Sequence, residues 1–414
     1  MNRITLRPGQ RGGAPQTLAT YSLGQRASFW IAAAVVVHTL WTSAAPAMSY
    51  PLYAAEWRLT PAVTTSIFAV YPLVVVTTLI MFGDISDYIG RRLAMLLGLA
   101  ASLIGVLLFA VAPTVHWIFV GRAFMGIGVG LSASPSAAAL VEYGPADQSK
   151  RAGAVTTVAQ SLGLALAFLV DGALIEYAPL PARLNFWALF VVIGAIFTAT
   201  WFLPRHTSGE ASGRWRPRIP RVANGIYRIF ATSTVSVMGA YALGAIILSL
   251  GAQIAHELID SANHLVNGAT LSLFAVTSGI VAVSTKGLSP QFSMKLGGIV
   301  CPLGTGLLVL STHQRSLPIF LAAVAAGGVG YSLSFLGGLN LINANAPAHH
   351  RGGTLSAVLL IAYFLQGAVA LLLGLAATVW GLRIATDLGC AAIALLGITA
   401  LVLGAFTRWS RRSS

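Results

Sequence analysis

The sequence predicts an all-α membrane protein in which twelve transmembrane helices form two pseudo-symmetric bundles of six. Three observations predict this fold class. The 414 residues are 56% hydrophobic and only 9% charged, with a mean hydropathy of +0.79, which leaves too little polar surface to dissolve in water. Long apolar segments recur along nearly the whole chain. One long polar connection divides these segments six and six.

Each apolar segment is long enough to cross a bilayer, because about 20 residues at ~1.5 Å per residue span its hydrocarbon core. The first set lies at about 28–53, 63–82, 93–112, 117–141, 153–175 and 184–203. The second set lies at about 228–253, 265–285, 296–311, 317–343, 353–378 and 384–407. We expect each segment to form one helix.

The long polar connection runs from about Pro204 to Gly225 and is rich in Arg, Pro, Gly and Ser, which is typical of a linker. The predicted parts are therefore a cytoplasmic tail at 1–27, a first bundle at 28–203, a cytoplasmic linker at 204–227, a second bundle at 228–407 and a cytoplasmic tail at 408–414.

The two halves also repeat in sequence. A Gly-Val-Gly run at 128–130, followed by Arg151, recurs at 328–330, followed by Arg351, and both elements are displaced by the same 200 residues. Chance similarity between two glycine-rich stretches is the alternative to duplication. Duplicated halves around a central linker are a recurring transporter design, with the substrate cavity between them near the bilayer midplane.

Orientation follows from the cations, because Lys and Arg in short loops stay on the cytoplasmic side. With the N-terminus inside, only Arg58, Arg183, Arg315 and Arg383 fall outside, and Arg122 lies within an apolar segment. The sequence therefore predicts a multi-pass protein of a bacterial-type inner (plasma) membrane with both termini in the cytoplasm. The first 27 residues lack an apolar core with a cleavage site, so no removed signal peptide is expected.

The formal charge of +14 is explained by this topology. Most of the excess lies in the tails and the linker, where it faces anionic lipid headgroups, so no nucleic-acid partner is predicted. Cys301 and Cys390 both fall inside predicted helices and are interpreted as small packing residues. We predict no metal site and no cofactor.

The most specific motif lies between the second and third segments, at 83–92, with the sequence Gly-Asp-Ile-Ser-Asp-Tyr-Ile-Gly-Arg-Arg. It resembles the pattern of the major facilitator superfamily, Gly-x-Leu-x-Asp-x-x-Gly-Arg followed by Lys or Arg. The matching residues are Gly83, Asp87, Gly90, Arg91 and Arg92. Ile85 stands where the family has Leu. The resemblance implies a gating loop and a major facilitator fold, closest in type to bacterial multidrug and sugar efflux members.

The corresponding loop of the second half, at 287–295, keeps only the first glycine and the cation position, with Gln291 in place of the aspartate. Any gating role therefore rests on the first copy. There, Asp87 would stabilise one conformation through a contact that is broken in the other.

The fourth segment contains Arg122 followed by several glycines, similar to a second motif of the same family. The glycines are interpreted as a helix-packing face. An unpaired cation in hydrocarbon needs a partner or water. Asp171 of the fifth segment lies at about the same depth, so we predict that the two form a buried pair or share a hydrated cavity. Asp171 is then a candidate proton site, and a static pair is the alternative.

The fifth segment departs from the signature that antiporters of this family have there. Gly163 and Gly172 remain, but Ala167, Phe168 and Asp171 occupy other signature positions. Export follows from the overall resemblance alone, and the alternative is a proton-coupled importer of a sugar or an organic anion.

Polar and aromatic residues near the middle of the segments are the candidate cavity lining. They are Trp41, Tyr71, Gln160, Tyr241, Asn340 and Gln366. His38 is a further candidate, for the cavity and for proton coupling, because its side chain titrates near neutral pH. Each of these residues alone also fits an interhelical hydrogen bond or simple packing. The mainly apolar lining favours a lipophilic or amphiphilic substrate.

Sequence signatures of a membrane-embedded enzyme are missing, since neither His-Glu-x-x-His nor Gly-x-Ser-x-Gly occurs. A receptor would not require a duplicated bundle with an intramembrane Arg and Asp. The sequence therefore predicts a secondary transporter, functional as a monomer, whose partners are a small solute, protons and the lipid bilayer.

Overall fold

The computed structural model describes residues 23–144, 149–204, 222, 225–285 and 287–406. Within these ranges every regular element is helical, and twelve helices are long and apolar enough to cross a membrane, which confirms the predicted fold class. The predicted tails lie largely, and the predicted linker mostly, outside the described residues.

The helices of the first half follow the order of the predicted segments. They are α1 (Gln25–Ala44), α3 (Pro61–Phe82), α5 (Arg91–Ala110), α6 (Val115–Glu142), α7 (Ser149–Tyr177) and α8 (Leu184–Trp201), with the short α2 (Tyr50–Trp57) and α4 (Ser86–Ile89) between them. The first predicted segment, 28–53, is thus divided. A turn that contains Pro46 separates α1 from α2, because proline has no backbone N–H to continue the helical ladder.

The second half repeats this order. Its helices are α9 (Tyr227–Ser249), α11 (His264–Ser284), α12 (Pro290–Gln314), α13 (Leu317–Asn345), α14 (Ala348–Trp380) and α15 (Leu382–Phe406), with α10 (Gly251–Gln253) and a π-helical turn (Ile254–Leu258) after α9. The predicted segment at 296–311 is longer than expected. The Ser289 side chain accepts a hydrogen bond from the Phe292 N–H and caps α12 just before Pro290, which suits the first helical turn.

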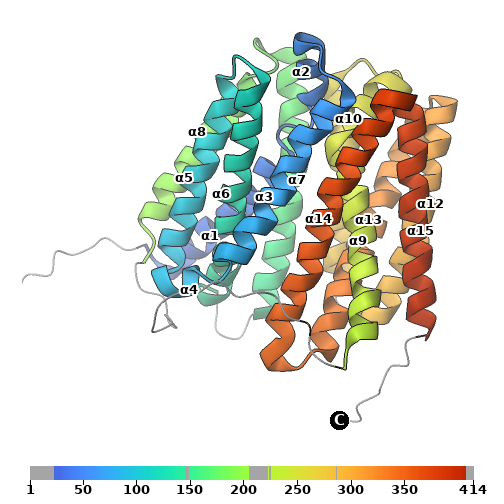
Figure 1. Ribbon diagram of the computed structural model, residues 1–414. Coiled ribbons are helices and arrows are strands. Elements are labelled where there is room, and N and C mark those ends of the chain that lie inside the picture. Colours follow the sequence, from blue (N-terminus) through green and yellow to red (C-terminus); the bar gives the residue numbers. More distant parts are fainter. Residues whose placement is uncertain (1–22, 145–148, 205–221, 223–224, 286, 407–414) are drawn as a thin grey trace, which may run out of the picture.

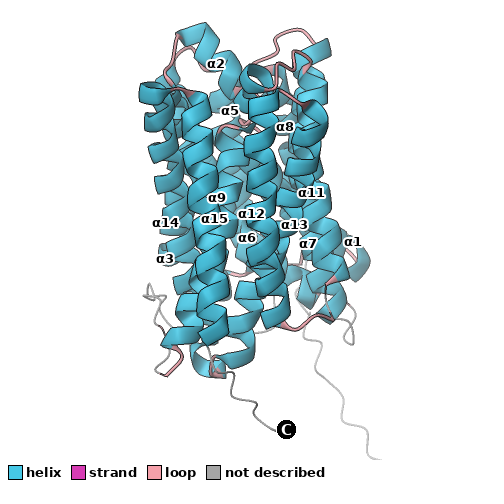
Figure 2. Cartoon of the chain, turned by 90° about the vertical axis from the view of Figure 1, so that its right-hand side faces the viewer, coloured by secondary structure: helices cyan, strands magenta, loops and turns pink. Residues whose placement is uncertain are grey.

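The two halves stand side by side, with the blue-to-green helices of the first half beside the yellow-to-red helices of the second (Figure 1). The short helices α2 and α10 lie at one end of the bundle, here called the α2 end. The opposite end, which contains α4 and the last described turn of α15, is called the α4 end. In the view turned by 90°, the long helices again lie side by side between these two ends (Figure 2).

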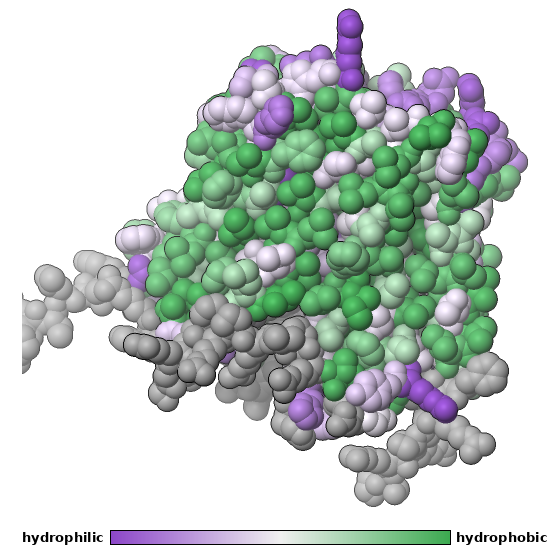
Figure 3. Space-filling view, viewed as in Figure 1, coloured by the Kyte–Doolittle hydropathy of each residue, from purple (hydrophilic) through white to green (hydrophobic). Residues whose placement is uncertain are grey.

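The surface is apolar over a broad belt between the two polar ends, as expected of a bundle that crosses lipid (Figure 3). Large apolar side chains face outward along this belt, such as Leu372, Val191 and Val379. In water such exposure would be costly, whereas in hydrocarbon it is the expected arrangement.

Two helix pairs form the main contact between the halves. The helix α7 packs on α11, and α3 packs on α14. Glycines permit close approach in both seams: a Cβ on Gly268 would meet the carbonyl of Phe168, and a Cβ on Gly374 would meet Thr65. The α7 backbone therefore meets the α11 backbone at Gly268, and the α14 backbone meets the Thr65 side chain of α3 at Gly374.

The glycines of α6 and α13 define the register of the internal repeat. Gly126 faces α3 and Gly128 faces α5, while Gly328 faces α11 and Gly330 faces α12. Because α11 and α12 are the counterparts of α3 and α5, Gly126 corresponds to Gly328 and Gly128 to Gly330. The repeat read from the two Gly-Val-Gly runs is therefore two residues out of register within this helix pair.

Candidate functional site

Arg122 of α6 is the only charged side chain among the fully buried large residues of the described chain. Its guanidinium carbon lies 4.4 Å from the ring centre of Tyr71 and 5.7 Å from that of Phe68, both on α3. These cation–π contacts compensate part of the cost of burial. The Nε and Nη1 atoms of Arg122 have no hydrogen-bond partner among the described residues. The predicted intramembrane cation is therefore stacked rather than paired.

A cluster of aromatic rings lies in the second half, on the side where α14 meets α3 of the first half. The rings of Tyr241 on α9 and Tyr363 on α14 meet edge to face at 4.9 Å, and Tyr241 lies 5.9 Å from Phe335 on α13. Tyr331 stacks on Phe335 at 5.8 Å. With Tyr71, which interacts electrostatically with Tyr363 across the two halves, these residues are called the central aromatic cluster.

Only Tyr71 and Tyr241 of this cluster were sequence candidates. Tyr331 and Phe335 are four residues apart and so share one face of α13, a pattern that was visible in the sequence. It was not diagnostic, since aromatic residues such as Phe364 on α14 also face outward.

Asp171 of α7 is buried, and its polar neighbour is the side chain of Asn185 on α8. The Asn185 Nδ2 also donates to the Ser49 Oγ at 3.1 Å. The second carboxylate oxygen of Asp171 has no partner among the described residues. Asp171 therefore points toward α8 and the turn before α2.

A direct ion pair between Arg122 and Asp171 is not present among the described contacts, so this version of the prediction is wrong for this conformation. The two residues match in depth but point in different directions, Arg122 toward α3 and Asp171 toward α8. They are linked indirectly. Ser49 contacts the partner of Asp171, and the adjacent Tyr50 interacts electrostatically with Arg122.

His38 lies inside the first bundle rather than on a central cavity. Its Nε2 is 2.9 Å from the Ser102 Oγ on α5, and its Nδ1 is 3.0 Å from the Val35 carbonyl. Both ring nitrogens are thus engaged within the core, which corrects the predicted cavity position. Trp41 is also buried, and its indole N–H has no partner among the described residues.

The three amide side chains that were predicted to line the cavity lie in different parts of the structure. Gln160 is half-buried on α7, eleven residues before Asp171 and hence on the same helix face. Gln366 is buried on α14 and approaches Gly244 of α9. Asn340 is exposed on α13, nine residues after Tyr331 and therefore on the opposite face. Asn340 does not join the central aromatic cluster, and its cavity position stays a prediction.

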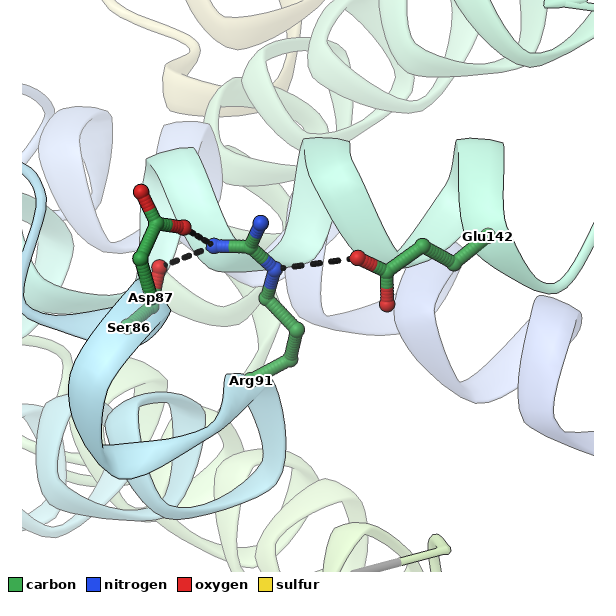
Figure 4. Close-up of polar contacts among 4 residues, drawn as sticks. All are labelled: Ser86, Asp87, Arg91 and Glu142. Atoms are coloured by element: carbon green, nitrogen blue, oxygen red, sulfur yellow. Dashed lines mark hydrogen bonds and ion pairs between the residues drawn. The ribbon is translucent and has the colours of Figure 1, made fainter. Parts of the chain in front are cut away.

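The predicted gating loop forms a compact charged turn at the α4 end (Figure 4). Arg91 donates through Nη1 to Asp87 at 2.5 Å and to the hydroxyl of Ser86. Through Nε it donates to Glu142 at 3.2 Å, which ties the start of α5 to the end of α6. The sequence identified Asp87 and Arg91 but missed Glu142. Glu142 could have been noticed because acidic residues are few, 11 Asp and Glu in all, and this one lies at the end of a predicted helix.

The remaining motif residues shape and anchor this turn. Gly90 has φ 86° and ψ 150°, a conformation essentially limited to glycine, and Gly83 follows the last residue of α3. The guanidinium of Arg92 lies 5.5 Å from the ring centre of Trp201 on α8. The loop is therefore built against the first bundle.

Hydrogen bonds join the two halves at the α2 end. Glu176, near the end of α7, accepts from the backbone N–H of His264 at 2.8 Å and from the Asn263 side chain at 3.2 Å. In the other seam, Thr378 of α14 accepts from the Ala62 N–H at 2.9 Å. Glu176 thus caps the N-terminus of α11 from the opposite half, which places a carboxylate at the positive end of the helix dipole.

A side groove of about 440 Å³ lies between α7 and α11, nearer the α4 end. Its lining is almost entirely apolar. The groove residues include Val158, Leu162 and Ala165 of α7 and Val276, Ile280 and Val283 of α11. Several of these side chains are exposed, so the groove opens onto the apolar belt.

A comparison with family models identifies one family. A family model described as Major Facilitator Superfamily matches residues 30–371. Among curated proteins, a multidrug efflux pump of Mycolicibacterium smegmatis, LfrA, is 33% identical over 32% of this chain and 26% of its own length. A sugar transporter ERD6-like 6 of Arabidopsis thaliana is 26% identical over 32% of this chain and 25% of its own length. The chain thus spans about a quarter of the length of the curated relatives it matches.

Solved structures share the fold at low sequence identity. A POT family transporter in complex with 5-aminolevulinic acid has a TM-score of 0.75 and 13% identity, covering 92% of this chain and 96% of that one. The nucleoside transporter NupG has a TM-score of 0.70 and 9% identity, covering 92% and 99%. A bacterial homologue of the lysosomal transporter Spinster has a TM-score of 0.71 and 13% identity, covering 94% and 99%.

Proposed function

The chain belongs to the major facilitator superfamily, and from that premise we propose that it exports a small amphiphilic solute in exchange for protons by alternating access. Membership of this family and the helical fold point to a transporter rather than an enzyme. The substrate, the coupling ion and the direction are the parts that we propose.

Alternating access is supported by the way the two halves meet. The observation that carries the proposal is the pair of seams, α7 with α11 and α3 with α14, fastened at the α2 end by Glu176 and Thr378. Most of the contact between the halves runs along these two seams, while each bundle packs mainly on itself, and the hydrogen bonds of Glu176 and Thr378 lie at one end only. Rocking one bundle against the other would break them while leaving each bundle intact.

At the α4 end, the Arg91 turn is a candidate gate. In this conformation Asp87 and Glu142 both hold Arg91 within the first half. We propose that Asp87 exchanges this contact for one with the second half when the α4 end closes, as the family resemblance implies.

Proton coupling is proposed for Asp171. It is a buried carboxyl with an unpartnered oxygen, and intramembrane acids of this kind commonly mark proton paths. Through Asn185 and the Ser49–Tyr50 turn, its protonation is linked to the surroundings of Arg122. His38 has weaker support in this role, since Ser102 and Val35 engage both of its ring nitrogens.

Export is favoured by the efflux pump relative, and import of a sugar is the second candidate because of the sugar transporter relative. The one-sided distribution of cations supports insertion in a plasma membrane with both termini in the cytoplasm. We propose that the monomer is the functional unit, since one chain supplies both bundles.

Replacing the carboxyl of Asp171 tests the proposal. An amphiphile panel is first screened by thermal shift, and the best hit is followed in proteoliposomes. For Asp171→Asn we expect proton-driven transport to fall about tenfold or more, because an amide cannot carry a proton, while counterflow without a pH gradient continues. Undiminished proton-driven transport would eliminate the coupling role.

Asp387→Asn is the matched control. Asp387 also lies a few residues inside the α2 end of its helix, α15, and also has one unpartnered oxygen, but its side chain is 34% exposed and its other oxygen is 3.1 Å from the His313 Nε2. We expect this variant to keep proton-driven transport. If both variants lose it equally, the loss reflects a general effect on the bundle.

A further inference from the structure

Several buried side chains of the first bundle present hydrogen-bond donors that no described residue accepts, and two of them interact with each other. These two are Arg122, through Nε and Nη1, and Tyr50, through its hydroxyl. Arg122 lies near enough to Tyr50 for its charge to act on the Tyr50 hydroxyl. A guanidinium has only donors, so what is missing beside it is an acceptor.

An anion is the acceptor that would also balance the charge. An isolated guanidinium taken out of water costs several kcal/mol even after relaxation. The rings of Tyr71 and Phe68 offset part of this cost. Asp171, the buried acid at the same depth, points toward Asn185 instead.

Tyr50 is suited to complete such a site. Burial raises the pKa of its hydroxyl above the ordinary value, although the nearby Arg122 acts in the opposite direction. The hydroxyl therefore keeps its proton at neutral pH and remains a donor.

We propose that Arg122 and Tyr50 bind the carboxylate of an aromatic monoanionic substrate, whose ring packs against the central aromatic cluster. This inference rests on the proposed transport function and names its substrate class. A single guanidinium with one hydroxyl matches one carboxylate, whereas a phosphate dianion would call for more donors. The ring of Tyr71 lies directly under Arg122, and Tyr363 and Tyr241 continue the aromatic surface into the second half.

A pair of probes of nearly equal shape tests the charge requirement. The full chain is purified in detergent, and binding of 2-naphthoate and of neutral 2-naphthamide is measured by calorimetry and by thermal shift. We expect 2-naphthoate to bind at least about tenfold more tightly than the amide. Arg122→Gln should remove this preference.

Tyr50→Phe keeps the test informative if Arg122→Gln fails to fold. Removal of an unpartnered hydroxyl should leave the unfolding temperature of the empty protein unchanged or raise it. The same substitution should weaken 2-naphthoate binding about three- to tenfold and leave 2-naphthamide binding unaltered. Tyr143→Phe is the matched control, because Tyr143 also has an unpartnered buried hydroxyl but lies at the α4 end, beside Glu142.

The outcomes separate this inference from the proposed function. If the two probes bind alike, if neither binds, or if chloride alone displaces 2-naphthoate without any preference for the aromatic acid, the carboxylate site is overturned. Carboxylate-selective binding that depends on Tyr50, together with no flux of any solute in proteoliposomes, would keep the site and overturn transport. Flux of neutral amphiphiles without carboxylate-selective binding would keep the transport function and overturn the carboxylate site.

Discussion

Gly90 shows how one residue determines the geometry of the charged turn. Its φ of 86° and ψ of 150° reverse the chain between α4 and α5 without a connecting loop. Arg91 then becomes the first residue of α5, where it reaches Asp87 on one side and Glu142 on the other. The glycine is needed because a Cβ in this region of backbone conformation clashes with the adjoining peptide.

Gly90→Ala is therefore expected to destabilise the protein by about 1–3 kcal/mol. The measurement is thermal unfolding of the full chain in detergent. Gly194→Ala is the control, because Gly194 lies within α8 with nothing within 4 Å of the added Cβ, and alanine there is expected to be neutral or to stabilise by up to about 1 kcal/mol. Equal unfolding temperatures for the two variants would contradict the role assigned to Gly90.

At the scale of elements, the seam between α7 and α11 combines packing with electrostatics. Gly268 brings the backbones together, and Glu176 supplies a charge to the N-terminus of the opposing helix. The packing of Gly268 stabilises the seam without any charge. If the bundles rock as proposed, the carboxylate acts only while the α2 end is closed and so favours that conformation.

Glu176→Gln is expected to weaken closure of the α2 end by about 1 kcal/mol, or roughly a fivefold shift in population, because the charge at the helix dipole is lost. Spin labels on Glu56→Cys and Gln314→Cys, both exposed at this end, report the distance between the halves. The native Cys301 and Cys390 are buried and shielded from labelling.

Glu257→Gln is the control for this measurement, since Glu257 bonds only to the nearby Gln253 among the contacts described for it. Its distance distribution should match that of the parent. A Glu176→Gln distribution that also matches the parent would show that the carboxylate does not hold the seam.

At the scale of the whole molecule, the distribution of basic residues between the two ends predicts the orientation in the membrane. The described basic residues near the α4 end include Arg26, Arg91, Arg92, Arg228, Lys295 and Arg351, whereas Arg58, Arg183, Arg315 and Arg383 lie at the α2 end. Because translocation of Lys and Arg in short loops is disfavoured, the α4 end is expected to face the cytoplasm.

Labelling with a membrane-impermeant maleimide in intact cells tests the orientation. We expect modification of Gln314→Cys at the α2 end and none of Gly352→Cys, whose side chain would extend into open space at the α4 end. Permeabilised cells, in which both should react, control for reactivity. The opposite pattern in intact cells would reverse the assigned topology.

The sequence by itself determined the twelve spans, the two halves and the charged turn. Each depends on position along the chain, since hydrophobic length and local spacing are recorded directly in the order of residues. The depth of Arg122 and Asp171 followed in the same way from the rise per residue.

Only the tertiary structure decided the direction in which each side chain points. Asp171 turns toward α8, His38 toward α5 and Asn340 away from the central rings, and Tyr50 and Tyr363 join the site unpredicted. In a soluble helix an apolar stripe marks the inner face. In lipid both faces are apolar, so the rotation of each helix is set by packing against its neighbours.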